Sequence, residues 1–110
     1  MIGFLKRVSA VLLVASAFAV CAQDVVTVSL VVKDGNFDPA TIEVPAGKRI
    51  KIEVSNEGKA PIEFESKALK FEKVLGPGAK SSVVINPLKA GEYAFFDEFH
   101  PDAKGKIVAK

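Results

Sequence analysis

The chain has 110 residues, 49% of them hydrophobic and 25% charged, with one His, one Cys, one Met and no Trp. This length supports one small domain. The formal net charge is only +2, and no basic stripe clusters along the chain. The composition therefore excludes a multidomain protein and gives no electrostatic surface for nucleic acid.

Residues 1–22 have the layout of a secretory signal peptide. Lys6 and Arg7 precede an apolar run over residues 8–22 that contains no acidic residue. The run is too short to cross a bilayer comfortably, because a spanning helix needs about 20 apolar residues. We therefore expect export rather than a membrane anchor.

We predict cleavage after Ala22, with cleavage after Ala19 and lipidation of Cys21 as the alternatives. The mature domain, residues 23–110, is then periplasmic. Without the two basic residues of the signal it has 13 basic and 13 acidic residues, and therefore no net charge. It also has no Cys and no Met, which excludes disulfides, thiolate catalysis, Cys-based metal sites and thioether ligands.

Short apolar segments separated by turn residues follow along the mature chain. They span residues 25–33, 41–44, 49–54, 62–65, 81–85, 92–96 and 105–109. Alternation is clearest where Ile50, Ile52 and Val54 share one face. This pattern predicts an all-β protein, a two-sheet Greek-key β-sandwich of about seven or eight strands.

Two parts of this pattern need a separate interpretation. Residues 66–75 are ambiguous, and we predict a loop with a short helix there. Residues 88–93 resemble a tyrosine corner, in which the hydroxyl of Tyr93 bonds back to the preceding backbone.

The densest polar cluster lies at residues 97–102, directly after an apolar strand. It contains His100, the one His of the chain, and imidazole is the side chain most often recruited for metals. Asp97 and His100, three residues apart around a tight loop, can converge on one ion. The alternative is an ordinary solvated surface loop.

Three other acidic residues are candidate metal ligands. Glu63 and Glu65 lie on one face of an alternating strand, with Glu72 further along, and the alternative is that they form its water-exposed face. Asp34 lies in a turn that its side chain can cap.

Enzymatic chemistry has little support. The serines that could pair with His100 lie in no nucleophile motif, and a sandwich of this size leaves little room for a sugar cleft. Residues 76–81 lack the spacing of a phosphate-binding loop.

Residues 37–47, 54–57 and 87–93, followed by a ligand-like loop, resemble a cupredoxin over nearly all of residues 24–110. In blue-copper members of that family this loop carries Cys-x-x-His and later an axial Met, with another His on an earlier strand. Here Asp97 stands at the Cys position and His100 at the His position.

No Met follows that loop, and the earlier strand offers Glu63 and Glu65 in place of a His. A blue thiolate–copper centre is therefore excluded. Carboxylates and one imidazole suit Cu(II), iron or Mn(II) better than Cu(I).

The sequence is more specifically similar to the small periplasmic cupredoxin components of bacterial ferrous-iron uptake systems. The motifs that carry this likeness are residues 61–66, 72–74, 76–78 and 93–100. The resemblance implies copper or iron binding coupled to oxidation of Fe(II). The implied site residues are Glu63, Asp97 and His100, with Asp34 and Glu65 as further candidates.

The resemblance implies a copper ion, with iron as a second candidate, and two partners, a periplasmic iron-binding protein and an iron permease. A single mononuclear centre passes one electron and cannot reduce oxygen to water, so a ferroxidase-type component would act with a partner. The alternatives are a copper carrier without a redox role and a metal-free Ig-like interaction module that uses a surface apolar patch including Phe99.

Overall fold

The computed structural model describes residues 25–110, and within that range it contains nine β-strands and no helix. No element that could cross a lipid bilayer as a helix is therefore found in this part of the chain. The predicted signal peptide and its cleavage site lie outside the described residues. The strands are β1 (Val25–Lys33), β2 (Asn36–Asp38), β3 (Thr41–Val44), β4 (Arg49–Asn56), β5 (Ile62–Ser66), β6 (Phe71–Leu75), β7 (Lys80–Ile85), β8 (Gly91–Asp97) and β9 (His100–Ala109).

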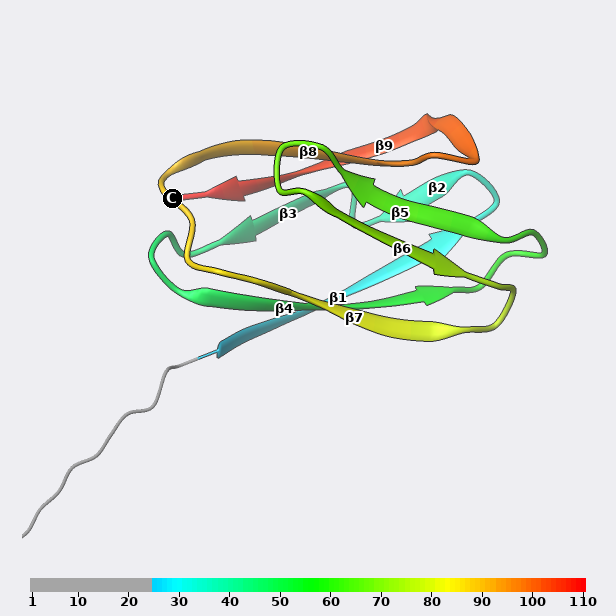
Figure 1. The fold of residues 1–110 in the computed structure, drawn as a ribbon, viewed down its shortest axis with the longest axis horizontal. Coiled ribbons are helices and arrows are strands. Elements are labelled where there is room, and N and C mark those ends of the chain that lie inside the picture. Colours follow the sequence, from blue (N-terminus) through cyan, green and yellow to red (C-terminus); the bar gives the residue numbers. More distant parts are fainter. Residues whose placement is uncertain (1–24) are drawn as a thin grey trace, which may run out of the picture.

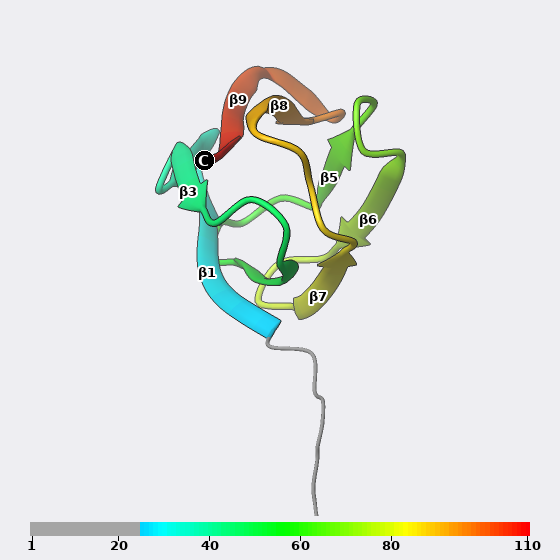
Figure 2. The same ribbon diagram turned by 90° about the vertical axis from the view of Figure 1, so that its left-hand side faces the viewer.

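The strands form two sheets packed face to face. One has the order β2-β1-β4-β7 and the other β3-β9-β8-β5-β6. The β1–β4 and β3–β9 pairs are parallel, and the other pairs are antiparallel. The two layers are seen edge-on in Figure 1, and Figure 2 shows them curving around a common interior. The predicted β-sandwich is confirmed.

The core lies between the sheets and is built by alternation along each strand. Ile50, Ile52 and Val54 of β4 are all buried, as their spacing predicts. Phe64 and Phe95 face them from the second sheet, with ring centroids 5.3 Å apart in an edge-to-face arrangement. This packing fixes which residues of β5 and β8 point outward.

The predicted loop or short helix at residues 66–75 is wrong, because β6 occupies half of it. β6 forms a hairpin with β5, in which Ser66 pairs with Phe71 and Ile62 pairs with Leu75. The Ser66 hydroxyl donates to the Ala94 carbonyl (2.7 Å) and accepts the Leu69 N–H (3.1 Å), which shapes the turn.

The sequence of β6 does not show the alternation that predicts a strand, because β6 lies at the edge of its sheet. Lys73 is exposed although it falls on the same face as Leu75, and Val74 is exposed although it is apolar. An edge strand is only half covered, so its sequence does not need to alternate. The short strand β2 was not predicted either.

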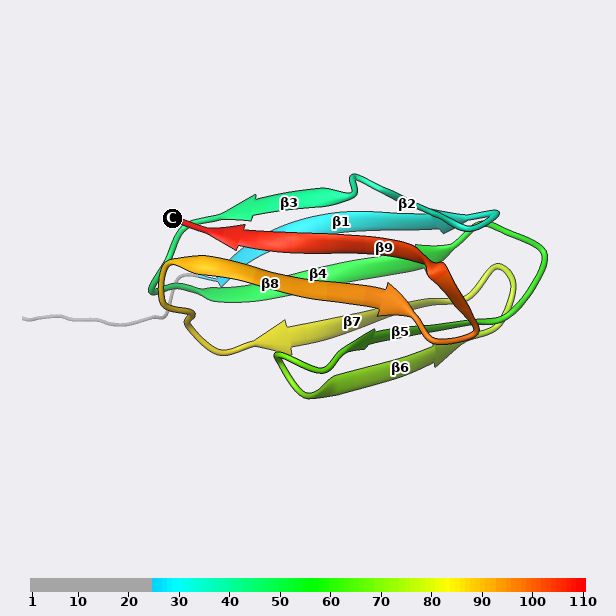
Figure 3. The ribbon, with the colours of Figure 1, turned by 90° about the horizontal axis from the view of Figure 1, so that it is seen from above.

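Several connections gather at one end of the sandwich, which we call the site end. They are the β1–β2 turn at residues 34–35, the β4–β5 loop at residues 57–61 and the β8–β9 turn at residues 98–99 (Figure 1, Figure 3).

The predicted tyrosine corner is present, because the Tyr93 hydroxyl donates to the Lys89 carbonyl at 2.7 Å.

Candidate metal site

The predicted polar loop at residues 97–102 is a tight hairpin turn followed by an irregular strand. Asp97 ends β8 and His100 begins β9, and the two residues pair with each other. The next pair is Phe96 with Lys104, so β9 has three extra residues at this point. Such a bulge redirects side chains at a strand end, and here it follows the one imidazole of the chain.

Asp97 is fully buried, with a relative exposure of 0%. Its Oδ1 accepts the backbone N–H groups of Glu63 (2.9 Å) and Phe99 (3.0 Å). Its Oδ2 lies 2.7 Å from Nδ1 of His100. A buried carboxylate is tolerated only when its oxygen atoms are hydrogen-bonded or paired, and both oxygen atoms of Asp97 meet that condition.

The imidazole of His100 joins this buried group to the surface. Its side chain is 45% exposed while one ring nitrogen contacts Asp97. The ring lines a hollow of about 310 Å³ at the site end. The hollow is lined by Asp34, Gly35, Asn56, Gly58, Lys59, Ala60, Ile62 and His100.

Asp34 reaches the same hollow from the other sheet, through the β1–β2 turn, where its φ is 50°. Asp and Asn are among the few non-glycine residue types that adopt this left-handed conformation readily. The predicted turn is confirmed. Asp34 and His100, distant in sequence, therefore share one hollow.

Asn56 organises the wall of this hollow. It is buried, its side-chain amide donates to the carbonyls of Ala60 (2.8 Å) and Leu75 (3.1 Å), and its Oδ1 accepts the Gly58 N–H (3.0 Å). A Cβ on Gly58 would lie 3.1 Å from the backbone nitrogen of Asp34, so the small residue allows the β1–β2 turn to pack closely. The sequence indicated only a turn here.

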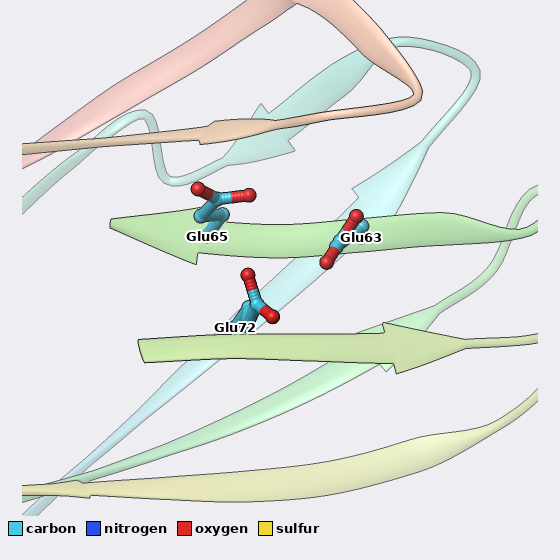
Figure 4. Close-up of side chains that lie close together, drawn as sticks. All are labelled: Glu63, Glu65 and Glu72. Carbon is cyan, nitrogen blue, oxygen red and sulfur yellow. The ribbon is translucent and has the colours of Figure 1, made fainter. Parts of the chain in front are cut away.

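The carboxylates of Glu63, Glu65 and Glu72 form a separate group, which we call the acidic patch. They project from the outer face of β5 and β6 (Figure 4). One carboxylate oxygen from each lies within 4.8 Å of the others. The pKa of Glu63 is raised above its ordinary 4.5, first by partial desolvation and then by the charges of Glu72 and Glu65.

The five predicted ligands thus fall into two groups. Asp97 contacts His100, and Asp34 lines the same hollow as His100. Glu63 is tied to Asp97 through its backbone N–H, but its carboxylate lies with that of Glu65 in the acidic patch. Within residues 25–110 the acidic patch is the one set of three such ligand atoms as close as 4.8 Å, so the predicted ligands do not form one cluster.

Glu72 was named with this acidic group but was not predicted as a ligand. Its signal was in the sequence, since a hairpin turning at residues 67–70 places Glu72 opposite Glu65, as observed. That inference requires the strand β6, which lies in the segment predicted as a loop with a short helix. The error in the fold therefore hid the direct pairing of Glu72 with Glu65.

The model of the cupredoxin-like domain family matches residues 6–109 of this chain. The chain belongs to the cupredoxin-like family. An uncharacterized protein of Rickettsia prowazekii (strain Madrid E) is 35% identical over 86 residues, which cover 77% of this chain and 69% of that protein.

Solved structures of copper proteins share the fold. Auracyanin A, a "blue" copper protein of Chloroflexus aurantiacus, is 15% identical with a TM-score of 0.66 over 79% of this chain and all of its own. The metal-binding domain of the Streptococcus pneumoniae Cu(I)-exporting ATPase CopA, solved with Cu(I), is 13% identical with a TM-score of 0.66 over 82% of this chain and 99% of its own. At these identities the likeness establishes the fold.

The donor atoms decide which copper chemistry fits this chain. Residues 25–110 contain no thiolate and no thioether. The carboxylate of Asp97, at the end of β8, stands at the position expected for the Cys of blue-copper members. A blue-copper donor set, with its Cys and axial Met, does not fit these residues. An imidazole with carboxylates fits Cu(II) or iron.

Proposed function

We propose that this is a periplasmic metal-binding protein that binds Cu(II) through His100 and assists the oxidation of Fe(II) during iron uptake. The observation that carries the proposal is the pair at the site end. A half-exposed imidazole is held 2.7 Å from a fully buried carboxylate and lines a hollow shared with Asp34. Metal-binding imidazoles typically have such a carboxylate behind them.

The donor atoms at the hollow and the charges of the acidic patch both favour binding of a highly charged metal ion. Around His100 and Asp34 the donors are nitrogen and oxygen, which suit Cu(II) rather than Cu(I). The acidic patch offers Glu63 and Glu65, now joined by Glu72, as the second candidate ligand set, and clustered carboxylates favour Fe(III) over Fe(II) because it carries the higher charge. The proposal thus places copper at the hollow and iron, as substrate, at the patch.

Cu(II) held by His100 beside Asp34 would supply a one-electron acceptor for the oxidation of Fe(II) to Fe(III) at the acidic patch. In this proposal His100 binds the copper ion, and the carboxylates of the acidic patch bind the iron ion and keep negative charge close to it. Continued turnover requires a partner that removes the electron. The resemblance to iron-uptake components supports a periplasmic iron-binding protein and an iron permease as the partners.

The test has two stages on the purified metal-free protein. Cu(II), Fe(II) and Fe(III) are first titrated separately by calorimetry into the wild type and into His100→Ala, with Asp102→Ala as the matched control from the same hairpin. We expect near-stoichiometric Cu(II) binding that His100→Ala abolishes and Asp102→Ala preserves. Absence of metal binding would leave an interaction module as the function.

The second stage adds Fe(II) anaerobically to the Cu(II)-loaded protein. We expect the Cu(II) signal in electron paramagnetic resonance to disappear as an equal amount of Fe(III) forms. Double substitution of Glu63 and Glu65 by Gln should slow this reaction without weakening Cu(II) binding. Stable Cu(II) in the presence of Fe(II) would contradict the redox role and leave a copper carrier.

A further inference from the structure

We propose that Asp97 is a positioning residue rather than a metal ligand. It fixes the imidazole of His100 in the tautomer with hydrogen on Nδ1, and so presents Nε2 as the metal-binding nitrogen. This inference rests on the proposed function and specifies the donor atom of the same site.

The hydrogen bonds of Asp97 support this role. Oδ1 accepts two backbone N–H groups, from Glu63 at 2.9 Å and Phe99 at 3.0 Å, and these donors stabilise the negative charge. An ionised carboxylate only accepts hydrogen bonds. The hydrogen in the 2.7 Å contact between Oδ2 and Nδ1 therefore belongs to the ring of His100.

The tautomer determines what the other side of the ring can do. A neutral imidazole that carries its hydrogen on Nδ1 has a lone pair on Nε2. Asp97 is buried with 0% exposure, whereas the His100 side chain is 45% exposed and lines the hollow with Asp34. Nε2 is thus the ring nitrogen left for a metal ion.

Direct coordination by Asp97 would be costly for the hairpin. A metal ion on Oδ1 would compete with the N–H groups of Glu63 and Phe99, which hold the β8–β9 turn against β5. A metal ion on Oδ2 would displace the contact with His100. An N–H group that loses its acceptor destabilises the fold, so the carboxylate is better placed to orient the ring than to bind the ion.

The one His of the chain makes this proposal directly measurable. Long-range ¹H–¹⁵N correlation of the purified metal-free protein, recorded where the ring carries a single proton, gives the state of both nitrogens without any assignment problem. We expect a protonated Nδ1 and an unprotonated Nε2. Hydrogen on Nε2 instead would overturn the proposal.

Two Asp→Asn variants separate positioning from mere structural support. Asp97→Asn keeps an oxygen for the two N–H groups but directs an NH₂ donor at Nδ1, so the tautomer should reverse. Zn(II), a diamagnetic probe for the site, should then bind about 10–100-fold more weakly, as is usual when a carboxylate behind a ligating His is lost. Asp102→Asn, an exposed change in the same hairpin, should alter neither the tautomer nor the affinity.

The Zn(II)-loaded wild type completes the test and does not depend on the folding of any variant. We expect a metal-shifted Nε2 signal with the Nδ1 hydrogen still present. Coordination through Nδ1, or an unchanged tautomer in folded Asp97→Asn, would overturn the positioning role. A wild type that binds neither Zn(II) nor Cu(II) overturns the proposed function, and the metal-free spectrum still decides the role of Asp97.

Discussion

Neighbouring strands of one sheet carry carboxylates in two opposite situations. Asp97, at the end of β8, is fully buried, and both of its oxygen atoms have partners. The acidic patch on β5 and β6 places three carboxylates within 4.8 Å of one another on the outer face. One charge is stabilised by fixed donors, while the others raise the energy of one another.

The contrast indicates that the two groups serve different purposes. The donors around Asp97 are backbone N–H groups fixed by the fold, so this carboxylate is part of the framework. The patch is a source of repulsion, which protons or cations relieve. Substitutions at the two places should therefore change stability in opposite directions.

Replacing Asp97 should have the largest effect on stability. Asp97→Ala leaves the part-buried N–H groups of Glu63 and Phe99 without their acceptor and opens a gap at a fully buried position, and we expect a loss of about 3 kcal/mol in the free energy of unfolding. Asp97→Asn, which keeps one acceptor oxygen, should lose less. Urea unfolding measures both, and a loss below about 0.5 kcal/mol for Asp97→Ala would contradict the framework role.

Replacing His100 should affect stability less and metal binding more. His100→Ala removes one partner of Asp97, but the side chain is 45% exposed and water can replace part of it, so we expect a loss of about 1 kcal/mol. Metal binding should be abolished. If His100→Ala instead loses as much stability as Asp97→Ala, the ring is primarily a structural part of the hairpin.

The same contrast explains what the sequence could predict. Alternation predicted β4 and β5, because one face of each strand is buried and the other is more exposed. The same pattern placed Glu63 and Glu65 on the outer face. The polar cluster at the end of β8, with its single His, selected Asp97 and His100, and the family motifs supported that choice. The burial of Asp97 was not predictable, since it depends on the Glu63 N–H, which lies 34 residues away in the chain.

The grouping of the other acidic residues was not predictable for a related reason. Asp34 shares a hollow with His100 only because the turns of both sheets gather at the site end. Glu72 joins Glu65 only through the register of a hairpin whose edge strand does not alternate. Local patterns identify elements, whereas such contacts depend on register and on the packing of the sheets.

Reversing the charge of one residue in the acidic patch should increase stability slightly. Glu72 pairs directly with Glu65, and like charges in that position destabilise a sheet. Glu72→Lys converts the pair into one of opposite charge, and we expect about 0.5 kcal/mol of added stability, or about 3 °C in Tm. Glu57→Lys, which makes the same charge change in the β4–β5 loop, should give no such gain.

The smallest effect concerns the pH dependence of stability through Glu63. Its pKa is raised in the folded protein, by desolvation first and then by Glu72 and Glu65. As the pH rises above about 4.5, the unfolded chain therefore loses this proton first, and the wild type loses stability relative to Glu63→Gln. The difference should grow up to the folded pKa and then stay constant.

Salt separates the two causes of that shift. At 1 M salt the Debye length is only about 3 Å, so the repulsion from Glu72 and Glu65 is screened while desolvation is retained. Thermal unfolding of wild type and Glu63→Gln across pH 4–8, at low and high salt, should therefore show a reduced but persistent difference. Its complete loss in salt would make repulsion the main cause, and an opposite slope with pH would contradict the raised pKa.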